Sequence, residues 1–131
     1  MDYTFYMLPL SIIQKAERGS DENGTFLLFN ERKIYRLHLV GSIAAIEINH
    51  ETGSGYLILD DTFYTILVHF QQPIFKYVED MKKGDLVEML GSIDIYNDSV
   101  TMSLTVIKSI TLERYCFNKL ESLRILREVS T

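Results

Sequence analysis

The chain has 131 residues, of which 47% are hydrophobic and 24% charged, a balance typical of one globular domain and unlike that of collagen-like or disordered chains. A single cysteine and three scattered histidines exclude an internal disulfide and a thiolate zinc site, and no apolar run approaches the ~20 residues that span a bilayer. The net charge is −5, whereas proteins that bind nucleic acid tightly on their own usually carry a basic face.

The first 32 residues predict a lead-in that packs on the main domain. The N-terminus has an acid at position 2 and no basic segment, so we expect part of the fold and no signal peptide. Residues 8–18 predict a short strand or a helical turn, residues 19–24 a polar turn, and residues 25–29 a short β-strand.

Residues 33–50 show the two-residue period of a half-buried β-strand. The apolar positions are odd-numbered before Gly41 and even-numbered after it, at Ile46 and Ile48. A glycine at such a change of phase predicts a β-bulge or a bend. A bend would let this one strand belong to two sheets of a closed barrel.

The following elements predict the order of an OB fold. Strands are expected at residues 56–59 and 63–70, and then a helix over residues 73–82, which begins at a proline and is followed by Gly84. Two strands, 86–96 and 99–110, are joined by a tight turn at 97–98. We therefore predict an all-β fold with one capping and one C-terminal α-helix, in which residues 33–112 form a five-stranded Greek-key OB-fold barrel.

Residues 113–129 predict the C-terminal helix, within a segment, 113–131, that we interpret as an assembly element. At ~100° per residue its main apolar stripe spans about 140°. The stripe comprises Leu112, Tyr115, Cys116, Leu120, Leu123 and Leu126, and two apolar residues lie outside it, Phe117 and Ile125. The stripe could simply dock on the barrel. A wide stripe with outliers instead favours packing against two neighbours in an intermolecular bundle.

The segment Ile34–Ile110 resembles the central OB domain of the middle subunit of replication protein A. The motifs are Leu39–Ile43 (LVGSI), Tyr56 with Asp60–Thr62 (DDT), Gly84–Gly91 (GDLVEMLG) and the upstream LPLSII of residues 8–13. Related OB subunits occur in the telomere-capping complex that resembles replication protein A and in the RecQ-helicase/topoisomerase dissolution complex. The phosphorylatable tail and the winged helix of the eukaryotic middle subunit have no counterpart here, as expected of a trimmed core or a shorter lineage.

The resemblance implies a non-catalytic subunit of a heteromeric single-stranded-DNA-binding complex in replication or repair. It implies that the C-terminal helix joins larger and smaller OB-fold subunits in a three-helix bundle, and that no cofactor is needed. Such a complex would work in the nucleus of a eukaryote, or otherwise in the cytoplasm or nucleoid. The alternative is a protein-binding OB scaffold that makes no direct contact with DNA, as the dissolution-complex relative would imply.

The resemblance also places base-stacking aromatic residues at Phe70 and Tyr96, with His69 assisting at a phosphate or a base. Phe70 shares a strand face with Tyr64, Ile66 and Val68, so the alternative is a core residue. Acidic residues around Tyr96 and short loops at 51–55 and 97–98 predict that the contact with DNA is weak.

No residue pattern predicts catalysis. Asp60 and Asp61 are adjacent, so on a strand their side chains would point to opposite faces, and DDT before a strand is an ordinary turn. The sequence has no phosphate-binding glycine loop, nucleophile elbow or metal-ligand cluster. We expect no enzymatic activity, no bound metal, no small-molecule substrate and no contact with a membrane.

Overall fold

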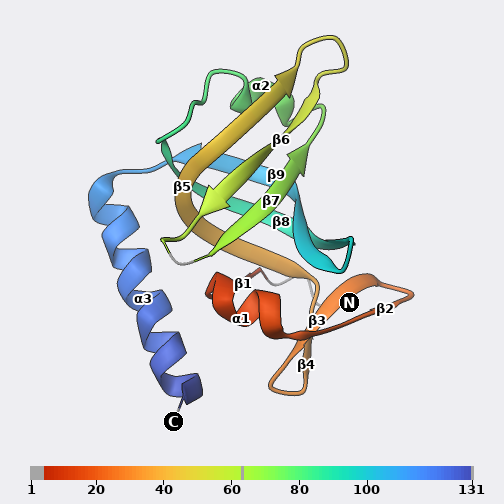
Figure 1. Cartoon of the computed structure of the whole chain (residues 1–131), viewed down its shortest axis with the longest axis vertical. Coiled ribbons are helices and arrows are strands. Elements are labelled where there is room, and N and C mark those ends of the chain that lie inside the picture. Colours follow the sequence, from red (N-terminus) through yellow and green to blue (C-terminus); the bar gives the residue numbers. More distant parts are fainter. Residues whose placement is uncertain (1–4, 63, 131) are drawn as a thin grey trace.

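Five strands close into a barrel in the computed structural model, which describes residues 5–62 and 64–130, with side chains in the last helix described up to residue 121 and at 124 and 125 (Figure 1). The barrel strands are β5 (Arg36–Asn49), β6 (Ser54–Asp60), β7 (Thr65–Phe70), β8 (Leu86–Tyr96) and β9 (Ser99–Ser109). They pair in the order β5-β6-β7-β9-β8, and β8 pairs back to β5. This is the predicted five-stranded OB-fold barrel.

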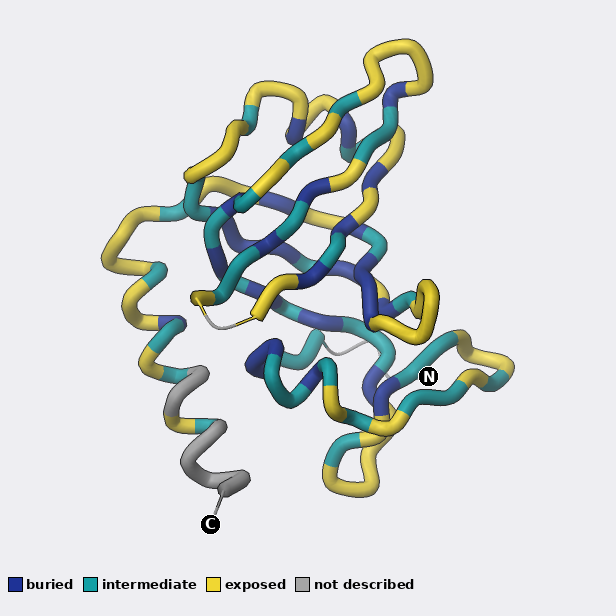
Figure 2. The backbone as a smooth tube through the Cα atoms, in the orientation of Figure 1, coloured by how far each residue is buried: buried dark blue, intermediate teal, exposed yellow. Residues whose placement is uncertain are grey.

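Buried residues alternate with more exposed ones along the barrel strands (Figure 2), and all five strands contribute to the buried set. Leucine, isoleucine, valine and methionine dominate the buried set, as expected where every second residue faces one core. Burying one such side chain stabilises the fold by about 1.5–3 kcal/mol. The hydrophobic core therefore lies inside the barrel, and the outward faces of the strands remain available for binding.

Strand β5 closes the barrel by pairing with two neighbours of one sheet, and its bulge lies beyond Gly41. Its first half pairs with β8 and its second half with β6, and Ser42 pairs with both. The register shifts between Ile43 and Ala45. A Cβ at Gly41 would lie 2.5 Å from the backbone oxygen of Asp60, so the glycine permits a close approach of two strands instead of forming the bulge itself.

The lead-in contacts the barrel through a short strand and a helix. Strand β1 (Tyr6–Met7) pairs in parallel with β5, and α1 (Leu10–Lys15) buries Leu10 and Ile13 at the lower end of the barrel in Figure 1. The helical-turn alternative for residues 8–18 is thus confirmed. The polar turn predicted over residues 19–24 is wrong, because strand β2 (Glu17–Asp21) already includes Gly19 and the turn itself is shorter.

Strand β2 opens a separate three-stranded sheet with β3 (Gly24–Phe29) and β4 (Arg32–Ile34). The single strand predicted over residues 33–50 is therefore divided at Tyr35. Ile34 pairs with Leu27 of the small sheet, whereas Arg36 pairs with Ser92 of the barrel. The buried positions change phase across the break, from Ile34 to Leu37.

The helix between β7 and β8 is shorter than predicted. Helix α2 covers only Phe75–Val78, where the sequence predicted residues 73–82, and it buries Phe75 and Val78 near the upper end of the barrel (Figure 1). Past Val78 the chain continues in turns, and Gly84, at φ +95°, donates its N–H to the carbonyl of Ile43. The predicted end of the helix at Gly84 is therefore wrong, since this glycine ends the turn segment that follows the helix.

Candidate nucleic-acid groove and partner helix

A groove of about 300 Å³ crosses the outer face of three barrel strands. Its lining residues come from β7, β8 and β9: Leu67, His69, Asp94, Ile95, Tyr96 and Thr101. The pairing register explains why they meet, since Thr101 of β9 lies opposite Leu67 on one side and opposite Asp94 on the other. Two of the three residues predicted to contact DNA, His69 and Tyr96, lie in this groove.

Tyr96 has the exposure that base stacking requires. It is 67% exposed and precedes the turn at Asn97 and Asp98, both of which adopt positive φ (50° and 66°). This is the tight hairpin turn that the sequence predicted. Because the turn begins directly after Tyr96, the ring of Tyr96 lies at the edge of the groove, where a base can reach it.

Phe70 is a core residue. It is 3% exposed and belongs to the same buried cluster as Val68 and Ile66 on its own strand. A ring that stacks on a base needs an open face, so the stacking role implied for Phe70 is wrong in this structure. Its aromatic character serves packing instead, at the end of β7.

Carboxylates hold the polar side chains around the groove. His69 Nε2 lies 3.0 Å from Asp94 Oδ2, and the hydroxyl of Tyr56 donates to a carboxylate oxygen of Glu47. The hydrogen bond to Glu47 raises the pKa of Tyr56 above its ordinary value. Among the described residues that line the groove, none is a lysine or an arginine. The face is thus acidic, which opposes strong binding of a phosphate backbone.

The C-terminal helix α3 (Leu112–Ser130) leaves the left side of the barrel in Figure 1 and runs downward, with contacts to β5 and β8. Polar groups make this contact. Asn118 is 3% exposed and donates to the carbonyl of Arg114, and the Tyr115 hydroxyl lies 3.2 Å from Thr62 Oγ1. Leu112, Cys116 and Leu120 of the predicted apolar stripe are exposed and do not dock on the barrel, whereas Tyr115 of the same stripe contacts it.

Glu88 fixes the start of α3 to the barrel. Its carboxylate, on a residue 7% exposed, accepts hydrogen bonds from Arg114 of α3 (3.1 Å) and from His38 of β5, and Lys108 of β9 lies 3.4 Å away. Burial raises the pKa of Glu88, but the hydrogen bonds from Arg114 and His38 outweigh this effect, so the pKa lies below its ordinary value. This contact could not be predicted from the sequence, because Glu88 and its three partners lie far apart along the chain.

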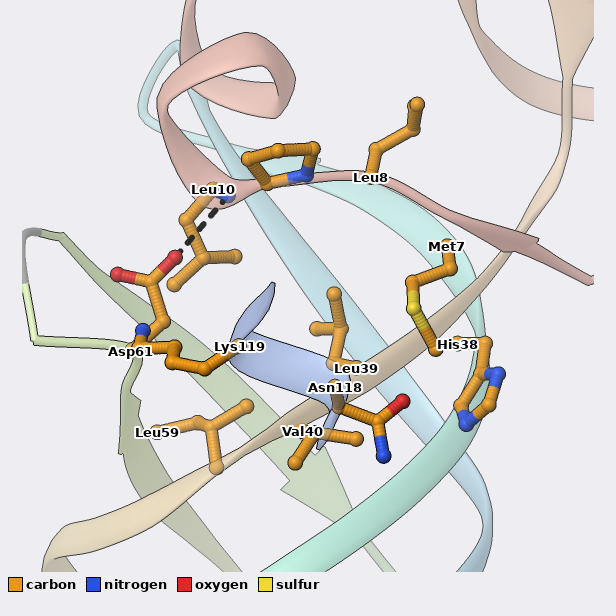
Figure 3. A pocket seen from close by; sticks show the side chains of 11 residues that line it. Met7, Leu8, Leu10, His38, Leu39, Val40, Leu59, Asp61, Asn118 and Lys119 are labelled. Carbon is orange, nitrogen blue, oxygen red and sulfur yellow. Dashed lines mark hydrogen bonds between the residues drawn. The ribbon is translucent and has the colours of Figure 1, made fainter. Parts of the chain in front are cut away.

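Helix α3, the barrel and the lead-in enclose only a small cavity between them. Figure 3 shows Asn118 of α3 beside Leu39 and Val40 of β5 and Lys119 extending toward Asp61, with the lead-in above them. The backbone N–H of Leu10 donates to Asp61 at 3.2 Å. The enclosed volume is about 20 Å³, room for about one water molecule. This part of the protein positions α3 against the barrel and the lead-in.

The opposite face of α3 exposes several apolar side chains to solvent, next to the charged residues Glu113 and Arg124. Leu112, Phe117 and Leu120 are 58–67% exposed, and Cys116 is exposed beside them. Tyr115 and Ile125 are only half-exposed, and at ~100° per residue they lie on the side of Asn118. Two residues of the predicted stripe, Leu123 and Leu126, lie outside the described side chains. We define the free face of α3 as Leu112, Cys116, Phe117 and Leu120.

Among the described residues, no group of three or more potential ligands is placed to hold a metal ion. None of the described helices is long and apolar enough to cross a membrane.

Comparison with known proteins gives structural matches only. No family model matches the sequence, and no curated protein matches it. A chain of the S. pombe Stn1–Ten1 complex superposes with a TM-score of 0.76 at 20% identity, over 93% of this chain and 90% of that one. A chain of a replication protein A heterotrimer bound to single-stranded DNA gives 0.72 at 17% identity, over 95% and 98%. A chain of the yeast Stn1 and Ten1 structure gives 0.60 at 15% identity, over 80% and 59%.

The first two matches extend past the barrel, since each covers more than nine-tenths of this chain. At these identities the likeness concerns the fold. This protein therefore has an OB fold, and its structural neighbours are OB-fold chains of the Stn1–Ten1 complex and of replication protein A.

Proposed function

We propose that this protein is a non-catalytic OB-fold subunit of a heteromeric complex that binds single-stranded DNA, and that α3 joins it to its partners. The observation that carries the proposal is the free face of α3, where three large apolar side chains face solvent. The structural neighbours come from the Stn1–Ten1 complex and from a replication protein A heterotrimer bound to single-stranded DNA, which supports the same class of assembly.

The way α3 docks supports a role in assembly. A helix that packs only on its own domain normally turns its apolar side inward. Here Asn118 and Tyr115 face the barrel, whereas Leu112 and Leu120 face solvent. Phe117 widens the exposed face, which favours contact with two neighbouring helices. We propose that the larger and the smaller OB-fold subunits provide them, as in the three-helix bundle that the resemblance implies.

The proposed contact with DNA is weak and centres on Tyr96. Stacking on one aromatic ring contributes about 1–3 kcal/mol per base, and the groove beside Tyr96 has no lysine or arginine to hold phosphates. Most of the affinity of such a complex would then come from its other subunits. If the source is a eukaryote, the complex would work in the nucleus.

The acidity of the groove also favours a second candidate function, a scaffold whose barrel binds only protein. Asp94 and Glu47 both lie beside the exposed aromatic residues of this face. The two functions differ in whether single-stranded DNA binds at all.

Replacement of Tyr96 by alanine distinguishes the two functions. We expect Tyr96→Ala to weaken binding of fluorescein-labelled oligo-dT at low salt by roughly 5- to 100-fold, because one stacking surface is lost. Fluorescence anisotropy on the isolated chain and on the purified complex measures the effect.

The matched control is Tyr77→Ala, which removes an exposed tyrosine on α2, away from the groove. It should leave the affinity unchanged. If the wild-type chain does not bind oligo-dT at low salt, and Tyr96→Ala changes nothing in the complex, the barrel is a protein-binding scaffold.

A further inference from the structure

We propose that Asp94 makes the groove selective for bases that present two hydrogen-bond donors side by side, which among the DNA bases means guanine. This inference rests on the proposed function, since it concerns the groove in which Tyr96 would stack a base. It assigns to Asp94 a role in base specificity.

Asp94 stands where the edge of a stacked base would lie. It is two residues before Tyr96 on β8, and side chains at that spacing share one face of a strand. Both residues line the 300 Å³ groove, together with Leu67 of β7 and Thr101 of β9. A base that stacks on Tyr96 and extends into the groove therefore brings its edge toward the Asp94 carboxylate.

The Asp94 carboxylate is held in place by His69 and can still accept further hydrogen bonds. Because an ionised carboxylate only accepts, His69 donates from Nε2 to Asp94 Oδ2 over 3.0 Å. Within the described part of the chain, Oδ1 has no hydrogen-bond partner, and a carboxylate offers about four lone-pair sites. Asp94 can thus accept two further hydrogen bonds from a ligand, while His69 fixes its orientation.

The negative charge of Asp94 favours a base whose edge carries hydrogen-bond donors. Guanine presents N1–H and N2–H₂ side by side on its Watson–Crick edge, a pair of donors that matches the two oxygens of a carboxylate. Thymine presents a single N–H between two carbonyl oxygens, which a carboxylate repels. Cytosine and adenine each present one amino group next to a ring nitrogen acceptor. No lysine or arginine in the groove lining compensates the charge of Asp94, so the preference for donors is not masked.

The test uses oligonucleotides of about 12 nucleotides, with the full-length protein at low salt and fluorescence anisotropy. The probes are oligo-dT, the same oligomer with interspersed 7-deazaguanine, and the same oligomer with inosine. 7-Deazaguanine keeps N1–H and N2–H₂ but does not form quadruplexes, and inosine lacks the N2 amino group. We expect about tenfold tighter binding of the deazaguanine oligomer than of oligo-dT, with inosine in between.

Asp94→Asn keeps the size of the side chain but replaces one acceptor by a donor. We expect it to reduce the preference, measured as the ratio of the two affinities within the same variant, to about twofold or less. Asp98→Asn is the matched control, because it removes the same charge from the same hairpin but lies in the exposed turn outside the groove lining. It should keep the full preference.

The outcomes separate this inference from the proposed function. Equal binding of all three oligomers by the wild type, or a preference that survives in Asp94→Asn, overturns the role of Asp94 and leaves the DNA-binding subunit standing. Absence of binding to every oligomer, by the chain and by the complex, overturns both.

Discussion

Leu120→Glu is expected to separate the protein from its partner subunits while the barrel stays folded. Leu120 is on the free face of α3, where a glutamate is well solvated in the free chain and is a good helix former. In a helical bundle the same carboxylate would be buried without a partner. Loss of a central apolar anchor typically costs about 2–4 kcal/mol of binding energy, which is roughly a 30- to 1000-fold loss of affinity.

Size-exclusion chromatography of the tagged protein with its co-purified partners measures this loss, and circular dichroism of the isolated variant checks the fold. Tyr77→Glu is the control, since it places the same charge at an equally exposed aromatic residue on α2. If Leu120→Glu remains in a complex of unchanged size and stability, α3 is not the assembly element.

Glu88→Gln is expected to lower the free energy of unfolding by about 1–3 kcal/mol near neutral pH. The variant loses the ionic hydrogen bonds to Arg114 and His38 and the charge opposite Lys108, and hydrogen bonds to charged groups contribute about this much. Arg114 and Lys108 are half-exposed, so solvent screening keeps the effect at the lower end of this range. Urea unfolding at constant salt measures it.

The difference in stability between wild type and Glu88→Gln should decrease as the pH falls. The pKa of Glu88 is lowered in the folded protein, so the unfolded chain binds the proton at higher pH than the folded chain does. The stabilisation is therefore present above the ordinary value of 4.5 and is lost as the pH falls through the lower, folded value. Wild type and Glu88→Gln should converge in stability well below pH 4.5.

Glu79→Gln removes an exposed carboxylate at the end of α2 and should change stability little at any pH. An equally small effect of Glu88→Gln near neutral pH would show that Glu88 does not fix α3 to the barrel. A difference from wild type that persists in acid would show that the ionised carboxylate is not the source of the stabilisation.

The barrel could be predicted from the sequence because its determinants are local. Each strand is marked by alternation of side chains, and residues 97–98 supply the turn chemistry that the tight hairpin needs. The predicted strand over residues 86–96 matches β8 at both ends. The hairpin of β2 and β3 was missed because Gly19 and Ser20 are typical turn residues, whereas here Gly19 pairs with Phe26 and makes room for its ring.

The orientation of α3 could not be predicted from its own sequence. The helical pattern defines an apolar stripe but not what the stripe faces. Contacts between distant residues decide this, since Glu88 holds Arg114 and Thr62 meets Tyr115. The same limit applies to Phe70. Its position on an alternating strand is compatible both with the core and with a binding face, and only the closed barrel shows that it lies in the core.

The reactivity of Cys116 tests the central claim most directly, because it is the only cysteine of the chain and lies on the free face of α3. A maleimide reagent should modify it readily in the isolated protein, since access controls the reaction. In the complex purified through a tag on this chain, peptide mass spectrometry should show at least about tenfold slower modification of Cys116. Equal rates in the two samples would contradict assembly through this face.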